Sequence, residues 1–61
     1  MLLEDLLEHF RQAPQKINVF DESAFMEDVF EYDDAVEKYG TRWVKEWEYI
    51  CSNNTLLVTL S

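Results

Sequence analysis

Apolar residues near the start of the chain recur at helical spacing, with acidic residues between them. This pattern predicts a short amphipathic helix over residues 2 to 12. Pro14 ends it, because the residue before a proline avoids the helical conformation. The residues expected on the apolar side are Leu3, Leu6, Leu7 and Phe10.

Two short stretches favour extended structure instead. Residues 15 to 20, QKINVF, carry β-branched and aromatic side chains that partly alternate with polar ones. Residues 56 to 60 form a short, apolar, β-prone run, which we expect to be a strand. A lone strand is not stable, so this one needs a partner, either residues 17 to 20 or residues 43 to 51.

The middle of the chain shows the longest helical pattern. Its apolar residues step by four, three, four and three, which predicts one continuous helix over residues 22 to 39. Asp21 or Ser23 offers an N-cap, and Gly40 stands where a helix stop is expected. The apolar residues in this series are Phe25, Val29, Tyr32, Val36 and Tyr39.

Residues 42 to 51 fit two structures. As a helix, they place five apolar residues on one face and pair Arg42 with Glu46 four positions on, and we prefer this interpretation. As a strand, WEYIC has suitable aromatic and β-branched residues, and the following SNN supplies a hairpin turn. The five apolar residues are Trp43, Val44, Trp47, Ile50 and Cys51.

Together these elements predict a small α+β fold that is predominantly helical, with two or three amphipathic helices and a short C-terminal strand or hairpin. At 61 residues the chain has room for a single compact domain over residues 1 to 61. Hydrophobic residues make up 48% of it and aromatic residues 15%, which indicates a folded protein and not a disordered acidic tail.

The charge balance restricts the partners. Thirteen acidic residues against five basic ones give a net charge of −8, which disfavours direct binding to nucleic acid or to an anionic membrane and favours a basic protein surface. The start of the chain lacks a basic region and an uninterrupted apolar stretch, so we expect neither a signal peptide nor a membrane span. With Cys51 as the only cysteine, we expect a cytoplasmic protein.

No motif specifies a reaction or a ligand. His9 and Cys51 are isolated, and no third group is suggested that would orient them as a catalytic dyad. No calcium-binding loop pattern is present, and Gly40 is the only glycine, so a glycine-rich phosphate loop is absent. We therefore expect a protein that is not an enzyme, with no catalytic residues, no cofactor and no metal site.

The predicted helix over residues 22 to 39 carries an unusual charge pattern. Glu27, Glu31 and Asp34 form a row opposite its apolar seam, with Asp33 and Glu37 on one flank. Five like-charge pairs three or four residues apart cost about 1–2.5 kcal/mol in total. Three of these acids would also lie toward the negative end of the helix dipole.

Two interpretations of this charge remain open. The acids form either a solvated face that keeps the protein soluble or a surface that docks into a basic groove. Phe30 beside the acids suits an interface anchor, although it also suits a wide face toward the core. The candidate partner-binding residues are Glu27, Asp28, Phe30, Glu31, Asp33, Asp34 and Glu37.

In size, charge and helix patterning, the whole chain resembles the small acidic DNA-mimic proteins that phages use against restriction, repair or CRISPR systems. The resemblance implies a non-catalytic inhibitor that occupies the basic nucleic-acid site of a defence or DNA-processing enzyme, in the host cell cytoplasm if a phage encodes it. The alternative is a structural or regulatory interaction module. It homodimerises, or docks on a larger protein, through an apolar surface around Trp43, Trp47 and the C-terminal strand.

Overall fold

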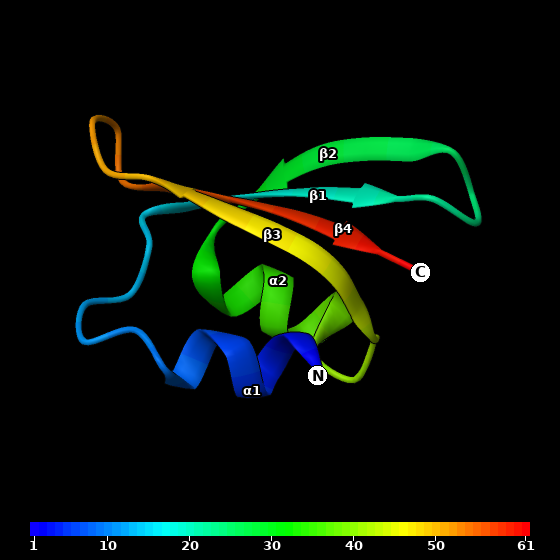
Figure 1. The fold of residues 1–61 in the computed structure, drawn as a ribbon, viewed down its shortest axis with the longest axis horizontal. Coiled ribbons are helices and arrows are strands. Elements are labelled where there is room, and N and C mark those ends of the chain that lie inside the picture. Colours follow the sequence, from blue (N-terminus) through cyan, green and yellow to red (C-terminus); the bar gives the residue numbers. More distant parts are fainter.

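The computed structural model describes all residues from 1 to 61, and these form two short helices and four strands (Figure 1). In chain order the elements are α1 (Leu3–Glu8), β1 (Lys16–Asp21), β2 (Met26–Phe30), α2 (Tyr32–Tyr39), β3 (Val44–Ile50) and β4 (Thr55–Leu60).

The four strands form one mixed sheet in the order β2-β1-β4-β3. β1 and β2 form one antiparallel hairpin, and β3 and β4 form a second. The two hairpins meet in the middle, where β1 and β4 run parallel, from Lys16 beside Thr55 to Asp21 beside Leu60. Both helices lie on the same side of this sheet, so the fold has two layers (Figure 1).

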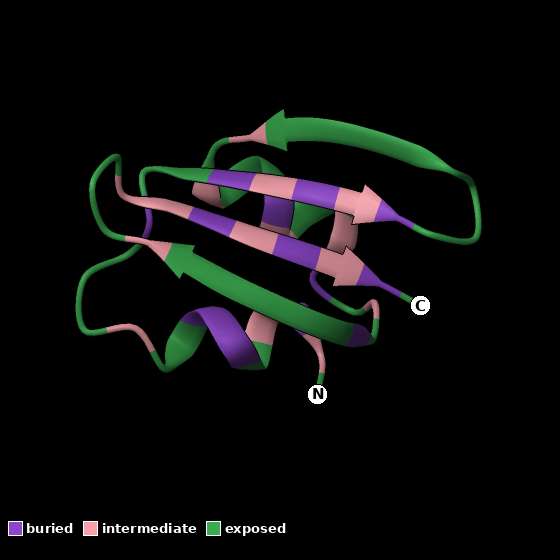
Figure 2. Cartoon of the chain, turned by 45° about the horizontal axis from the view of Figure 1, so that its top comes forward, coloured by how far each residue is buried: buried purple, intermediate pink, exposed green.

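The core lies between the helices and the two central strands. Figure 2 shows β1 and β4 striped by alternating burial, whereas the edge strands β2 and β3 are exposed along almost their whole length. This alternation is expected when only one face of a sheet is covered. The buried apolar residues of the core are Leu3, Leu6, Leu7, Ile17, Val19, Ala35, Val44, Leu56, Val58 and Leu60.

The predominantly helical fold predicted from the sequence is wrong, because strands account for 43% of the residues and helices for only 23%. The first helix is present but ends at Glu8, well before Pro14. The extended stretch over residues 15 to 20 is confirmed as β1, and the C-terminal strand is confirmed as β4. β4 pairs with both of the segments considered for it, since it lies between β1 and β3.

The continuous helix predicted over residues 22 to 39 is also wrong. Only Tyr32–Tyr39 is helical, while Met26–Phe30 is a strand that pairs with β1. The apolar series therefore crosses two elements, and its first members do not face the core, since Phe25 and Val29 are exposed. A strand followed by a short helix thus spaces its apolar residues in a way that resembles one long helix.

The chemistry that suggested a helix start closes a hairpin turn instead. The Asp21 carboxylate accepts hydrogen bonds from the Ser23 backbone N–H at 3.2 Å and from its hydroxyl at 2.8 Å. Asp and Ser side chains make this local contact both in helix caps and in turns. The left-handed position of the turn is held by Phe25 (φ 54°), where glycine or asparagine is usual, so no turn signal is visible in the sequence at this position.

Residues 42 to 51 form the strand that was the less favoured alternative. The expected helical pair between Arg42 and Glu46 is absent, because Arg42 binds Asp21 across the fold. The SNN turn is confirmed: Asn54 takes a left-handed conformation (φ 52°) that asparagine tolerates, and it leads into β4. Gly40, which ends α2, is needed for close packing, since a Cβ there would collide with the Val36 carbonyl oxygen.

Candidate functional site: the open sheet face

One face of the sheet has no helix over it, and we call it the open face. Residues directly opposite one another in a ladder point to the same side of the sheet, so the strand registers show which residues belong to the open face. The residues that alternate with them along each strand point toward the helices. The residues of the open face are Lys16, Asn18, Phe20, Glu27, Val29, Glu46, Glu48, Ile50, Thr55, Leu57 and Thr59.

Acidic side chains line both edges of the open face. Glu27 lies on β2 at one edge, and Glu46 and Glu48 lie on β3 at the other, all of them exposed. Three strand spacings separate the two edges, which corresponds to roughly 14 Å. Between them the half-buried side chains of Phe20 and Leu57 form an apolar centre. The face therefore carries two neighbouring apolar side chains, beside the polar residues Asn18 and Thr59, between two negative margins.

No unpaired cation lies on the open face. Its only basic residue is Lys16, and the Lys16 ammonium lies 3.8 Å from the Glu31 carboxylate. Arg42 and Lys45 are engaged elsewhere, with Asp21 and Glu22. None of the three acids Glu27, Glu46 and Glu48 is therefore in an ion pair within the chain.

The aromatic centre of this face extends to a strained, exposed residue. Phe25, at the turn between β1 and β2, is 85% exposed and has a left-handed backbone. Its ring packs edge-on against Phe20, with 5.9 Å between the ring centroids. A left-handed conformation costs a residue with a Cβ roughly 1–2 kcal/mol, and strain of this kind is concentrated at functional sites.

Asn18 adds an unpaired acceptor to the same face. It lies in the middle of β1, opposite Val29 and beside Leu57. Its side-chain oxygen is buried and has no hydrogen-bond partner. A buried acceptor without a partner costs about 1–3 kcal/mol.

The structure separates the predicted partner-binding residues into three places. Glu27 and Glu31 belong to the open face and its margin, since Glu31 is held by Lys16. Asp28 and Phe30 point to the helix side of β2, because they lie opposite the buried residues Val19 and Ile17. Asp33, Asp34 and Glu37 are exposed on α2.

The predicted row of Glu27, Glu31 and Asp34 therefore does not exist. These residues lie on a strand, at the residue before α2, and on α2. The dipole argument also changes sign for Asp33 and Asp34, which lie in the first turn of α2. Negative charge is stabilising at that end of a helix. The self-repulsion expected for one long acidic helix is largely removed by the fold.

Phe30 does not form an exposed interface anchor. It is half-buried against the core, and its ring packs edge-on on Tyr39 with 5.3 Å between centroids. The Lys38 ammonium lies 5.4 Å from the centre of the same ring, a cation–π contact. The alternative interpretation of Phe30, a residue facing the core, agrees with these contacts.

Sequence reasoning missed three residues of the open face, Phe20, Glu46 and Glu48, and the adjoining turn residue Phe25. The preferred helix over residues 42 to 51 pairs Glu46 with Arg42, and the predicted helix over residues 22 to 39 places Phe25 in its apolar seam. The available signal was the alternation in KEWEYI, where acids and aromatic residues take turns. In a strand, this alternation places the acids on one face and the aromatic residues on the other.

The two tryptophans do not share a helical face. Both lie in or beside the edge strand β3, and they are strongly exposed, Trp43 by 59% and Trp47 by 50%. The Trp47 ring packs edge-on against Phe10 at 5.8 Å. β4 is a central strand with neighbours on both sides, so it is not free to add to the sheet of a partner.

The other chemical groups remain apart. The His9 ring is bonded locally to the Asp5 carbonyl oxygen at 2.6 Å, and Cys51 is exposed in the loop between β3 and β4. No group of three or more His, Cys, Asp or Glu side chains is arranged to hold a metal ion. Neither helix is long and apolar enough to cross a membrane.

Comparisons with protein-family models, curated proteins and solved structures find no match to this chain.

Proposed function

We propose that this protein is a non-catalytic binding protein that docks its open face on a basic surface of another protein. The observation that carries the proposal is the strained, exposed Phe25 against Phe20, between two margins whose acids Glu27, Glu46 and Glu48 form no ion pair within the chain. An apolar centre with flanking charge is the usual arrangement of an interface hot spot.

The partner class that suits this surface best is an enzyme that processes nucleic acid. Such enzymes bind phosphates through clusters of Lys and Arg, and a chain with net charge −8 is attracted to the same clusters. Occupying that site would exclude the nucleic acid, so we propose an inhibitor. The resemblance to phage DNA mimics now depends on size and charge alone, since the helix patterning is absent.

A second candidate is an interaction module that associates through apolar surface, either with itself or with a larger protein. The exposure of Trp43 and Trp47 along the edge strand favours it. Salt distinguishes the two candidates, because ionic strength screens electrostatic docking and leaves apolar association nearly unchanged.

Capture from a cell lysate on the immobilised protein, followed by competition, tests the proposal. We expect a basic nucleic-acid enzyme to be retained at low salt, to elute in a moderate salt step, and to be displaced by duplex DNA or RNA. The activity of the eluted enzyme should fall when the free protein is added. Retention that survives both salt and nucleic acid, or self-association alone, would contradict the proposal and support the second candidate.

A further inference from the structure

The two edges of the sheet differ in how they are protected. On the β2 edge, the Asp28 carboxylate accepts a hydrogen bond from the Val29 backbone N–H at 2.8 Å. Glu27 and Asp28 also place charge on both faces of this short strand. Edge charges that interrupt pairing are a known protection against strand addition. Charged residues occur on β3 as well, so what distinguishes β2 is that its Val29 N–H is already satisfied within the chain.

Along the β3 edge, another segment of the chain pairs with the backbone only at the beginning. There the Val44 N–H donates to the Met1 carbonyl oxygen at 2.8 Å, and Leu2 forms an antiparallel bridge with Trp43. From Lys45 to Ile50 no segment of the chain pairs with this edge. Residues 1 and 2 thus cover only the beginning of the β3 edge.

The register identifies the backbone groups that face outward from this edge. The Leu60 carbonyl oxygen accepts a hydrogen bond from the Glu22 backbone N–H, so it points from β4 toward β1. Backbone N–H and C=O groups alternate in direction from one residue to the next along each strand of an antiparallel ladder. Because Leu60 points toward β1, this alternation leaves the N–H and C=O groups of Trp47 and Tyr49 pointing outward from β3. These groups are the donors and acceptors that an added strand would use.

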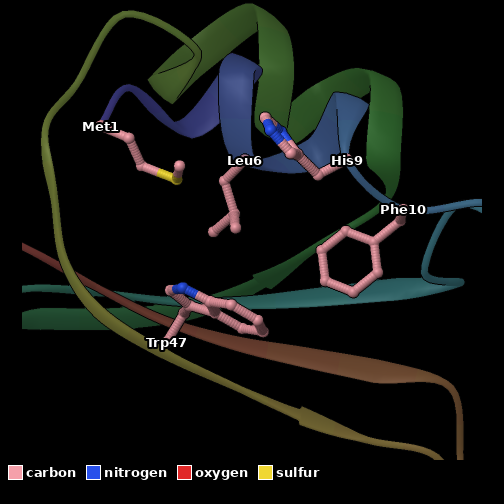
Figure 3. A pocket seen from close by; sticks show the side chains of 5 residues that line it. All are labelled: Met1, Leu6, His9, Phe10 and Trp47. Atoms are coloured by element: carbon pink, nitrogen blue, oxygen red, sulfur yellow. The ribbon is translucent and has the colours of Figure 1, made fainter.

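An apolar pocket of about 180 Å³ lies beside the open part of the edge, between α1 and β3 (Figure 3). Small-molecule sites have volumes of roughly 300–1,000 Å³, so this pocket suits one apolar side chain better than a metabolite. Its lining residues are Met1, Leu6, His9, Phe10 and Trp47.

The two faces of β3 specify what an added strand must carry. On the helix side, Trp47 and Tyr49 both pack against the Phe10 ring, at 5.8 and 5.5 Å. On the open face, Glu46 and Glu48 are exposed and have no cation within ion-pair distance. A strand beside β3 would therefore place every second side chain over aromatic rings and the others next to carboxylates.

We infer that the β3 edge between Lys45 and Ile50 binds an extended segment of a partner protein in which basic and apolar residues alternate. The segment pairs with Trp47 and Tyr49 through the backbone, fills the pocket with an apolar side chain, and neutralises Glu46 and Glu48. A second copy of the chain does not fit, because antiparallel pairing centred on Trp47 would place Glu46 opposite Glu48, and like charges there are destabilising.

This inference deepens the proposed function, since Glu46 and Glu48 also form one margin of the open face. It adds a mode of recognition, strand addition, and a chemical description of the partner segment. It can fail while docking through the open face holds, because backbone pairing at the edge can be removed without changing any charge.

Amide NMR spectra of the labelled protein test the inference with two synthetic peptides. The first has about eight residues, an ordinary strand length, in which Lys alternates with Val. The second has the same composition with the Lys residues in one block. We expect the alternating peptide to shift the amides of Trp47 and Tyr49 and to protect them from hydrogen exchange, and the block peptide to cause only small, salt-sensitive shifts.

Chemical synthesis of the chain supplies the matched control. Methylation of the Tyr49 backbone nitrogen removes an outward donor and keeps every side chain, and the same change at Val29 alters the β2 edge. We expect the first to weaken the alternating peptide about tenfold, the effect of one lost hydrogen bond of about 1.4 kcal/mol, and the second to have little effect. The spectrum of each free protein checks that it folds.

Equal binding of both peptides, or loss of binding in neither methylated protein, would overturn strand addition. A dimer formed by the free protein through β3 would also overturn it. If lysate capture remains sensitive to salt and to nucleic acid while these tests fail, the proposed function stands, but strand addition at the β3 edge is not part of it. If the peptide binds as described and capture fails, the edge is a binding site for another class of partner.

Discussion

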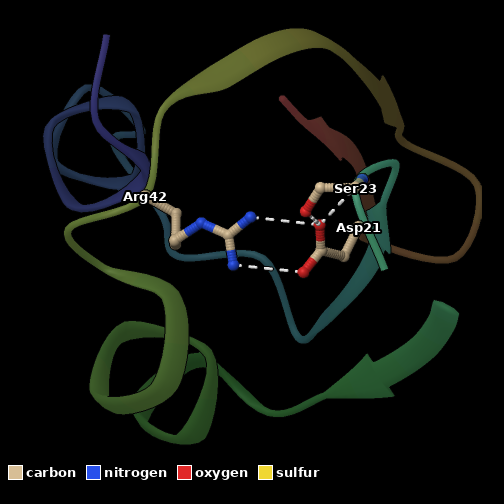
Figure 4. A network of polar contacts seen from close by, with 3 residues as sticks. All are labelled: Asp21, Ser23 and Arg42. Atoms are coloured by element: carbon tan, nitrogen blue, oxygen red, sulfur yellow. Dashed lines mark hydrogen bonds and ion pairs between the residues drawn. The ribbon is translucent and has the colours of Figure 1, made fainter. Parts of the chain in front are cut away.

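Arg42 donates to both carboxylate oxygens of Asp21, from Nη1 to Oδ2 at 3.1 Å and from Nη2 to Oδ1 at 3.0 Å (Figure 4). The two residues are 21 positions apart, so this bidentate pair fastens the end of β1 to the connection between α2 and β3. Asp21 continues the buried side of β1 after Ile17 and Val19. The guanidinium compensates the charge of a carboxylate that occupies a nearly buried position.

This pair makes the stability of the fold sensitive to acid. The hydrogen bond from Arg42, with that from Ser23, lowers the pKa of Asp21 from 3.8 to about 2. A carboxyl group whose pKa is lower in the folded state stabilises the fold above its ordinary pKa and loses that contribution as the pH falls. The contribution is therefore complete at neutral pH and disappears between about pH 4 and pH 2.

We expect Asp21→Asn to be clearly less stable than the parent at pH 7, and the difference to shrink toward zero at pH 2. Urea unfolding followed by tryptophan fluorescence at pH 7, 4 and 2 measures it. Comparing parent and variant at each pH cancels the titration of the other carboxylates. A difference that stayed constant from pH 7 to pH 2 would contradict the assigned role of the pair.

The two faces of β4 provide a test of the register. Leu56 is fully buried and Leu57, the next residue, is half-buried on the open face. Leu56→Ala should lower the free energy of unfolding by about 2–5 kcal/mol, which is comparable to the whole stability of a domain this small. Leu57→Ala should cost less than about 1 kcal/mol. Similar losses in urea titrations of both variants would show that the assigned faces are wrong.

Charges on α2 should have opposite effects at its two ends. Glu37→Gln removes like-charge contacts with Asp33 and Asp34, each worth about 0.2–0.5 kcal/mol, so thermal and urea unfolding should show a small gain in stability. Asp34→Asn relieves one of these contacts but also removes an acid from the first turn, a loss of about 0.3–1 kcal/mol. We expect no gain for Asp34→Asn. A clear gain in stability from both changes would support the prediction of a single long acidic helix over residues 22 to 39 and contradict the short α2.

The strain at Phe25 can be measured separately from its ring. Phe25→Asn and Phe25→Ala both remove the contact with Phe20, but only asparagine tolerates the left-handed backbone well. The Asn variant should be more stable than the Ala variant by about 1 kcal/mol in urea unfolding. Both variants should lose binding to the captured partner. Equal stabilities would mean that the backbone at residue 25 is not strained.

The sequence predicted those elements in which local pattern and fold agree. Leu3, Leu6 and Leu7 are buried on a short helix, and the run from Leu56 to Leu60 is a strand, as expected. In both places the spacing of apolar residues matches the face that the fold covers. The prediction failed where long-range contacts decide the structure, because a sequence pattern reports only local spacing.

Two such contacts account for most of the error. Arg42 and Lys45 have acids at helical spacing, yet they bind Asp21 and Glu22, which are more than twenty residues away. The turn after Asp21 lacks glycine, since Phe25 accepts the strained position, so the boundary between β1 and β2 was hidden. The same errors explain why the predicted partner-binding residues do not lie together, because the assumed row of acids depended on an uninterrupted helix.

The most direct test of the account compares two triple variants, each with three negative charges removed. One is Glu27→Gln, Glu46→Gln, Glu48→Gln on the open face, and the other is Asp33→Asn, Asp34→Asn, Glu37→Gln on α2. Retention of the partner by each immobilised variant at low salt is the measurement. We predict that the open-face variant loses the partner and that the α2 variant keeps it. Equal losses would indicate attraction to net charge alone, and loss only in the α2 variant would place the binding surface on the helical side of the molecule.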